Sequence, residues 1–437
     1  MGASSIVPAS APAFISIDSN PSSAQWRTID ALASKFPDKQ KAVDSIKEDL
    51  SKQDVSWEHE VRPFLGKEFD FVWLDFQNKG MNFVGLTQPS NRAKLKALIG
   101  KLNGQPSTKP AAKVVYDTFK GWTVIASKQA TIDRFEQESN GAASSLADDK
   151  SFKDSMDRLG SDSVVRAFVN GKSLMQLARQ RGGTQLKPYI DKVGTLDWIA
   201  LRMGATSEGV GFDTIVHGTP GSLFKGAAKS GSFSSKLLGK VPADALVYLS
   251  FHGSTGMFNG LQQNPALNTP QFRQFAHPLQ QLGRVLEGEN AIYARPGKGL
   301  PEVTLIATPP KGVNGAAVVD RLVKGAAGPV SGIYYANVDG KLVVSDQQAA
   351  LGVVRGGGKS LSDNPEFNQA RDASGMPDKT WSTLYVNIHS TVPYVEQLAH
   401  AHLPAEIARN VKPLRSAVEY AASHTHELQI SFFLRIK

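Results

Sequence analysis

The sequence predicts an α+β protein with an internal duplication, in which two similar halves each form a mainly antiparallel, curved sheet packed with helices. Three observations support this prediction. Blocks of the first half return in the same order in the second half. Segments with alternating apolar residues are interspersed with segments of helical period. Short turns containing Gly join consecutive strand patterns, which favours antiparallel pairing.

The repeated blocks keep their order along the chain. The matching segments are 7–16 with 241–250, 64–68 with 285–290, 81–102 with 302–323, 115–127 with 334–346, 145–152 with 360–367, and 164–174 with 381–391. Within these blocks Gly66 matches Gly288, and Asn170 matches Asn387. Six collinear matches indicate a duplicated scaffold, with insertions confined to loops.

The duplication sets the predicted domain organisation. The first repeat covers residues 6–218 and the second covers 241–437. Residues 219–240 contain Pro220, several Gly and Ser, four Lys and no acidic residue. This composition predicts a basic linker between the repeats.

The elements of the first repeat follow from its periodicity. Alternating apolar residues predict strands at 13–17, 69–74, 82–86, 113–118, 123–126, 164–169, 198–204 and 209–216. A helical period predicts helices at 25–35, 40–52, 91–102, 130–137 and 172–180. Tight hairpin turns are predicted at Lys120-Gly121, Asp339-Gly340 and Glu208-Gly209, because Gly readily adopts positive φ. The apolar segment 429–436 is predicted to be a paired strand.

Composition restricts the function. The chain has a formal net charge of +9 and a pI of about 9.4, which favours anionic partners. No run of five or more Lys or Arg occurs, so we expect no nucleic-acid partner. The absence of cysteine excludes thiolate nucleophiles, cysteine-ligated metals and disulfides. We expect no cofactor.

Four motifs carry a resemblance to a known family. They are the Val-Pro-Ala-x-Ala opening at 7–11, the Pro-Phe-Leu-Gly element at 63–66, the Gly-Trp-Thr-Val-Ile-Ala hairpin at 121–126 and the Ser-Leu-Ala-Asp block at 145–148. Together they resemble the bacterial domain-of-unknown-function family 3352, over most of both halves. The resemblance implies an extracytoplasmic protein tethered by an N-terminal transmembrane or lipoprotein segment. It implies no catalytic residue, because the family has no established activity.

The N-terminal sequence bears on this tether. Met1-Gly2-Ala3-Ser4-Ser5 has neither the basic nor the apolar segment of a signal peptide, and the folded pattern begins at Val7-Pro8. We therefore expect that a leader or tether precedes this chain in the native protein, and that the native form is membrane-anchored.

One candidate metal site lies near the C-terminus. His424 and His426 form a His-x-His pair, which can chelate zinc or copper when both rings lie on one face of a strand. The alternative interpretation is a pair of solvated histidines in the turn before the last strand. The first half has no counterpart to this pair.

A second candidate site is aromatic. Phe71 and Trp73 alternate in one predicted strand, and Phe83 and Trp122 lie in neighbouring strand patterns. These four residues are candidates for lining an apolar ligand groove. The alternative is that they pack in the core.

We therefore expect a non-enzymatic, extracytoplasmic binding or structural protein of the bacterial cell envelope, whose partner is an unknown protein or an anionic envelope component. The first alternative is a carrier that holds a hydrophobic or lipid-like ligand in an apolar groove. A second alternative is a hydrolase with an unrecognised site, although no Gly-x-Ser-x-Gly motif occurs.

Overall fold

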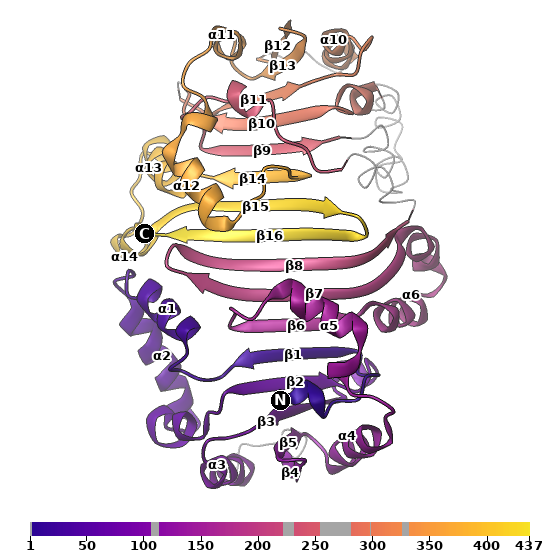
Figure 1. Cartoon of the computed structure of the whole chain (residues 1–437). Coiled ribbons are helices and arrows are strands. Elements are labelled where there is room, and N and C mark those ends of the chain that lie inside the picture. Colours follow the sequence, from indigo (N-terminus) through magenta and orange to yellow (C-terminus); the bar gives the residue numbers. More distant parts are fainter. Residues whose placement is uncertain (1, 106–112, 222–230, 254–280, 298, 326–331) are drawn as a thin grey trace. The chain divides into compact units, whose positions relative to one another are not determined.

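The computed structural model describes residues 2–105, 113–221, 231–253, 281–297, 299–325 and 332–437. It divides into two compact units, Met1–Thr219 and Pro220–Lys437, whose elements are labelled in Figure 1. Both units combine helices with antiparallel strands, so the α+β class is confirmed. In the part of the chain that the structure describes, no helix combines the length and the apolar character needed to cross a bilayer.

The first unit, called unit 1, contains one antiparallel sheet. Its strands run in the order β8-β7-β6-β1-β2-β3-β5-β4. Their bounds are β1 Ala13–Asp18, β2 Glu68–Trp73, β3 Phe83–Thr87, β4 Val115–Phe119, β5 Trp122–Ala126, β6 Val165–Asn170, β7 Gly194–Thr206 and β8 Gly209–Pro220. Each strand predicted from alternating apolar residues has an observed counterpart.

Helices α1, α3, α5 and α6 of unit 1 begin at residues whose side chains cap them. Asn91 accepts a hydrogen bond from the backbone of Lys94, and Asp149 accepts one from that of Phe152, as expected for N-cap side chains. The helices are α1 Ala24–Ala33, α2 Lys39–Lys52, α3 Arg92–Gly104, α4 Gln129–Gly141, α5 Lys150–Leu159 and α6 Gly171–Val193. Short turns of helix are η1 Ala3–Ser5, η2 Trp57–Val61, η3 Arg62–Phe64, η4 Asn78–Gly80 and η6 Leu146–Asp148. Helix α5, which lies across β6 and β7, was not predicted (Figure 1).

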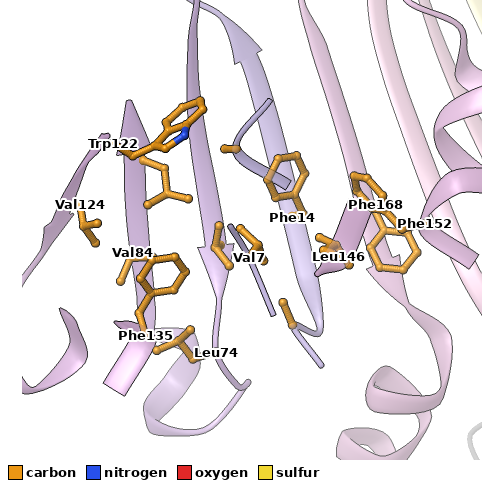
Figure 2. Packing of buried hydrophobic residues seen from close by; sticks show 14 of the residues in the cluster. Val7, Phe14, Leu74, Val84, Trp122, Val124, Phe135, Leu146, Phe152 and Phe168 are labelled. Atoms are coloured by element: carbon orange, nitrogen blue, oxygen red, sulfur yellow. The ribbon is translucent and has the colours of Figure 1, made fainter. Parts of the chain in front are cut away.

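The larger apolar core of unit 1 lies on one face of its sheet, and a smaller cluster that includes Leu95 and Ile99 of α3 packs with Ile125 on the other face. Because successive side chains of a strand point to opposite faces, β2 presents Val72 to the core and Phe71 to the other face. Figure 2 shows side chains from strands, from α4 and α5, and from the N-terminal segment meeting in this core. Its labelled members are Val7, Phe14, Leu74, Val84, Trp122, Val124, Phe135, Leu146, Phe152 and Phe168.

The second unit, called unit 2, also contains an antiparallel sheet. Its strands run in the order β16-β15-β14-β9-β10-β11-β13-β12. Their bounds are β9 Val247–His252, β10 Glu289–Arg295, β11 Glu302–Ala307, β12 Tyr334–Val338, β13 Lys341–Ser345, β14 Ser382–Val386, β15 Leu414–His424 and β16 Glu427–Ile436. The helices are α10 Gly315–Gly325, α11 Ala349–Gly356, α12 Pro365–Ser374, α13 Ile388–Ala399 and α14 Ala405–Val411, with short turns η7 Leu238–Lys240 and η9 Leu361–Asp363.

The strand orders of the two units match position by position, and local contacts match too. The backbone N–H of Leu146 donates to the Val7 carbonyl at 2.7 Å, and that of Leu361 donates to the Val241 carbonyl at 2.7 Å. Capping boxes made by Ser145 and Asp148 and by Ser360 and Asp363 begin η6 and η9. The same helix-starting contacts therefore occur at equivalent places.

The matched glycines Gly66 and Gly288 lie where the backbone leaves no room for a side chain. A Cβ at Gly66 would lie 2.2 Å from the Gln88 carbonyl oxygen, and one at Gly288 would lie 2.1 Å from that of Thr308. We expect Gly66→Ala and Gly288→Ala each to lower the stability of its own unit by about 1–3 kcal/mol, because the backbone must shift. Hydrogen exchange followed by mass spectrometry would assign each loss to its unit.

Two helical glycines supply controls for this prediction. A Cβ at Gly100 or at Gly352 would meet no atom within 4 Å. Replacing either one with alanine should leave stability unchanged or raise it slightly, because alanine favours helix. Equal effects at crowded and open positions would contradict the interpretation.

Two turn predictions are confirmed and one is wrong. Both residues have positive φ in the turns Lys120-Gly121 (47° and 86°) and Asp339-Gly340 (49° and 76°). Gly209, however, is the first residue of β8, and Ser207 and Glu208 form that turn. A two-residue turn one position earlier keeps the alternation of β7 and β8 in register.

Part of the predicted linker belongs to unit 2. Leu237 is fully buried in the core of this unit. The carboxylate of Glu289 accepts hydrogen bonds from the Leu237 backbone at 2.8 Å and from the Ser235 hydroxyl at 2.7 Å. The apolar side chain and the buried carboxylate fix residues 235–237, whereas residues 222–230 lie outside the described part of the chain.

Candidate functional site

A row of aromatic side chains lies on the face of the unit 1 sheet that is opposite to the core. Phe69, Phe71 and Trp73 of β2 are partly exposed there. Phe83 of β3 lies opposite Trp73 in register, and the centroids of these two rings are 5.6 Å apart. The Phe71 and Phe83 centroids are 6.1 Å apart, and those of Phe69 and Phe71 are 5.1 Å apart. These four residues, called the aromatic row, form a continuous series of ring contacts.

Backbone features hold the rings of the row in place. Gly85 lies opposite Phe71, and a Cβ there would be 3.1 Å from the ring of Phe69, so the missing side chain makes room for that ring. At the other end, the Trp73 indole N–H donates to the Gly80 carbonyl at 3.1 Å. Because its one polar group is satisfied, the indole can present its apolar surface in a fixed orientation.

The apolar surface extends onto one strand beside the row. Ile15 of β1 lies opposite Phe71 and is partly exposed. On the other side, Ile125 of β5 lies opposite Gly85 but packs against the apolar cluster that Leu95 and Ile99 of α3 help to form. A contiguous apolar surface of this kind is typical of an interaction site, whereas single exposed apolar residues are common everywhere.

Cationic side chains lie at the Trp73 end of the row. Lys79 and Arg181 are exposed, and the Arg181 guanidinium donates to the Phe76 carbonyl at 2.8 Å. Met81 beside them is 52% exposed. This end of the row therefore combines apolar surface with positive charge.

The acid nearest to these cations in sequence, Asp75, is engaged within unit 1. It accepts a hydrogen bond from Asn82 at 2.8 Å and forms an ion pair with Arg134. Partial burial raises the pKa of Asp75, but the hydrogen bonds from Arg134 and Asn82 outweigh this effect and lower it overall. The carboxylate is thus ionised at neutral pH and satisfied by Arg134.

The four predicted groove residues do not lie together. Phe71, Trp73 and Phe83 belong to the aromatic row, but Trp122 is only 3% exposed and packs in the core on the other face (Figure 2). The alternation along β5 places Trp122, Val124 and Ala126 on the core side. Trp122 is therefore a core residue and not a part of the row.

The predicted metal pair lies at the tip of the β15–β16 hairpin. His424 is the last residue of β15, and His426 lies in the turn with φ of 63°. Both are exposed. Among the described residues, no group of three or more His, Cys, Asp or Glu side chains is placed to hold a metal ion. Zinc binding by the pair remains a prediction.

A hollow of about 370 Å³ lies between α1 and the β7–β8 turn. Its lining includes Arg27, Lys35 and Ser207. The Arg27 guanidinium already donates to the Ser22 carbonyl, and the Lys35 ammonium lies 3.5 Å from the Ser207 carbonyl. None of the residues that line the hollow is aromatic, so it lacks the ring contacts that distinguish the row.

Comparisons with known proteins give no family assignment. No protein-family model matches the chain, and no curated protein matches it. Four chains of solved structures match. "Structure of crystal form IV of TP0453" has 15% identity and a TM-score of 0.25, covering 48% of this chain and 83% of that one. "Structure of crystal form I of TP0453" has 17% identity and a TM-score of 0.24, covering 46% and 79%. Both TM-scores are below 0.5, so this similarity shows neither a shared fold nor a shared function.

Proposed function

We propose that this protein is a non-enzymatic, extracytoplasmic binding protein of the cell envelope, and that the aromatic row is its binding surface. The observation that supports this proposal is the continuous, partly exposed contact of Phe69, Phe71, Trp73 and Phe83. Complete burial of a large apolar side chain contributes about 1.5–3 kcal/mol of favourable free energy. The rings of the row are only partly buried, so a partner that covers their exposed surface gains the remainder of this free energy. The envelope location follows from the resemblance to family 3352.

The second candidate function, a carrier of a lipid-like ligand, is favoured by the cationic end of the row. An acyl chain can lie along Phe71 and Phe83, while an anionic headgroup lies near Lys79 and Arg181. The net charge of +9 also favours an anionic ligand. The proposed ligand of this carrier is an anionic amphiphile, because its apolar chain matches the aromatic row and its headgroup matches the cations Lys79 and Arg181.

We also propose that the two units arose by duplication of one domain. Support comes from the matching strand orders, the paired capping boxes and the crowded glycines at equivalent positions. The face with the aromatic row differs between the units. Where unit 1 has Phe71 opposite Ile15, unit 2 has Ile292 opposite Leu249, and where Phe83 lies opposite Trp73, Val303 lies opposite Ala294.

This difference gives a matched pair of variants for testing the binding surface. We expect Phe71→Ser to weaken binding of a fluorescent fatty acid about tenfold, because roughly half of the free energy gained by burying an aromatic side chain is lost. Ile292→Ser, at the equivalent place in unit 2, should leave the affinity unchanged. Titration by fluorescence gives both dissociation constants.

Native mass spectrometry of the purified chain provides an independent measurement. A bound lipid in the wild type that is missing from Phe71→Ser would support the carrier function. Equal losses of affinity in both variants would show that the row is not the binding surface. Binding of the fatty acid by neither variant nor wild type would contradict the carrier function.

A further inference from the structure

Unit 1 contains a buried acidic residue that its binding surface does not use. Asp70 lies on β2 between Phe69 and Phe71, and its side chain points to the core face. The residue has no exposed surface. No described residue makes a well-formed hydrogen bond to either carboxyl oxygen. Burying a carboxylate without partners is costly, so the neutral carboxylic acid is the favoured form in the folded unit.

The neighbours of Asp70 explain why it is not neutralised by an ion pair. Ser16 of β1 lies directly opposite Asp70, and Arg166 of β6 lies opposite Ser16, one strand further away. Glu68, two residues earlier on the same face of β2, is a second acid. Leu86 of β3 is the other cross-strand neighbour and is fully buried. Arg166 is thus separated from Asp70 by β1, whereas the acid Glu68 lies on the same strand as Asp70.

These surroundings set the titration of Asp70. Burial raises the pKa of Asp70 to about 8, and the negative charge of Glu68 adds to the rise. The hydroxyl of Ser16 and the charge of Arg166 act in the opposite direction. Folding therefore shifts the titration of this carboxyl from acidic into mildly alkaline pH.

The N-terminal segment lies over this part of the core. The Ala3 backbone N–H donates to Glu68 Oε1 at 3.2 Å, and Ala3 and Val7 are buried in the same cluster as Val72. The segment is also held by the hydrogen bond from Leu146 to the Val7 carbonyl and by one from Ala9 to the Ser144 carbonyl at 3.2 Å. An ionised Asp70 beside Glu68 requires solvent or a cation to reach it, and displacement of this segment admits solvent.

We propose that Asp70 is a proton-sensitive switch in unit 1, and that its ionisation as pH rises opens the N-terminal segment over β1 and β2. The equivalent position in unit 2 carries no acid, since Ala291 lies opposite Ser250 where Asp70 lies opposite Ser16. The switch is independent of any ligand. Because β2 also carries Phe71, opening would in addition change the surface proposed for binding.

The sign of the pH dependence is determined by the two titrations. The unfolded chain ionises at an ordinary aspartate pKa of 3.8, and the folded unit ionises near 8. Between these values unfolding releases a proton from Asp70, so the contribution of Asp70 to stability is highest below pH 4 and falls as pH rises towards 8. The unfolding equilibrium constant of the wild type, divided by that of Asp70→Asn, should rise about tenfold per pH unit between pH 5 and 7.

The test combines this ratio with local hydrogen exchange. At pH 8, after correction for intrinsic exchange rates, the amides of Ala3, Ala9 and Leu146 should lose protection in the wild type and keep it in Asp70→Asn. Two further variants test the electrostatic origin. Glu68→Gln should move the loss of protection to lower pH, and Arg166→Met should move it to higher pH. A ratio that does not change with pH, or equal protection of the segment in wild type and Asp70→Asn, would overturn the proposal.

Discussion

Replacing Trp122 with alanine should lower the free energy of unfolding of unit 1 by about 3–5 kcal/mol, the usual cost of truncating a buried tryptophan. Trp122 is only 3% exposed and packs with Val84 and Phe135 in the core shown in Figure 2. The cavity left by the indole cannot collapse easily, because strands on both sides of β5 hold the backbone. Urea denaturation, with hydrogen exchange to assign the loss to unit 1, measures the effect.

Trp73→Ala supplies the control, because the same side chain is removed from the opposite face of the sheet. Trp73 is partly exposed, so we expect a loss of about 1 kcal/mol in stability and a clear loss of fatty-acid affinity. Trp122→Ala should retain affinity at temperatures where unit 1 remains folded. If the two variants lost stability equally, the assignment of Trp122 to the core and Trp73 to the binding surface would be wrong.

Glu366→Leu should destabilise unit 2 by about 3–5 kcal/mol, because it removes a carboxylate that is paired with a buried guanidinium. The side chain of Arg435 on β16 is 3% exposed and forms an ion pair with Glu366 of α12. It also donates to Gln369 at 2.7 Å. The amide of Gln369 cannot replace the lost charge. Denaturation of the variant, followed through the exchange of unit 2 amides, measures the cost.

The double variant Glu366→Leu with Arg435→Met distinguishes the contribution of the buried charge to stability from the contribution of side-chain packing. If the loss of the buried counter-charge is the cause, the double variant should be more stable than Glu366→Leu alone, because residue 435 then carries no charge. Arg415, which also pairs with Glu366, is 26% exposed and can be solvated. Additive losses in the double-mutant cycle would show that the pair acts only through its packing.

Most elements of unit 1 could be predicted from the periodicity of the sequence. Which of the two alternating sets of side chains in a strand points to the core could not be predicted in the same way. In β2, the large residues Phe69, Phe71 and Trp73 alternate with Asp70 and Val72. Hydrophobicity alone would place the aromatic side chains inside and Asp70 outside. The structure has the reverse arrangement, because the N-terminal segment, α4 and α5 all pack on the Val72 face. That choice depends on long-range contacts absent from the local pattern.

The differences in the remaining elements have similar causes. Helix α5 was missed because it is short and mostly polar, although Phe152 and Leu159 recur at helical spacing and are buried. Helix α6 extends beyond the predicted end at residue 180, through a break at Gly183. Among the groove residues, Trp122 could not be distinguished from Trp73, since both lie in apolar strands and only the packing of the opposite faces separates them.

The strict alternation of β2 also limits how this gene segment can vary in length. Asp70 in the core and Phe71 on the binding surface are adjacent residues of one strand. Because successive side chains point to opposite faces, the face that each residue occupies depends on the number of residues that precede it in the strand. A deletion of one codon within β2 would exchange the two faces, bringing aromatic rings towards the core and acids towards the surface. We therefore expect length changes to be tolerated in the connections and not within this strand.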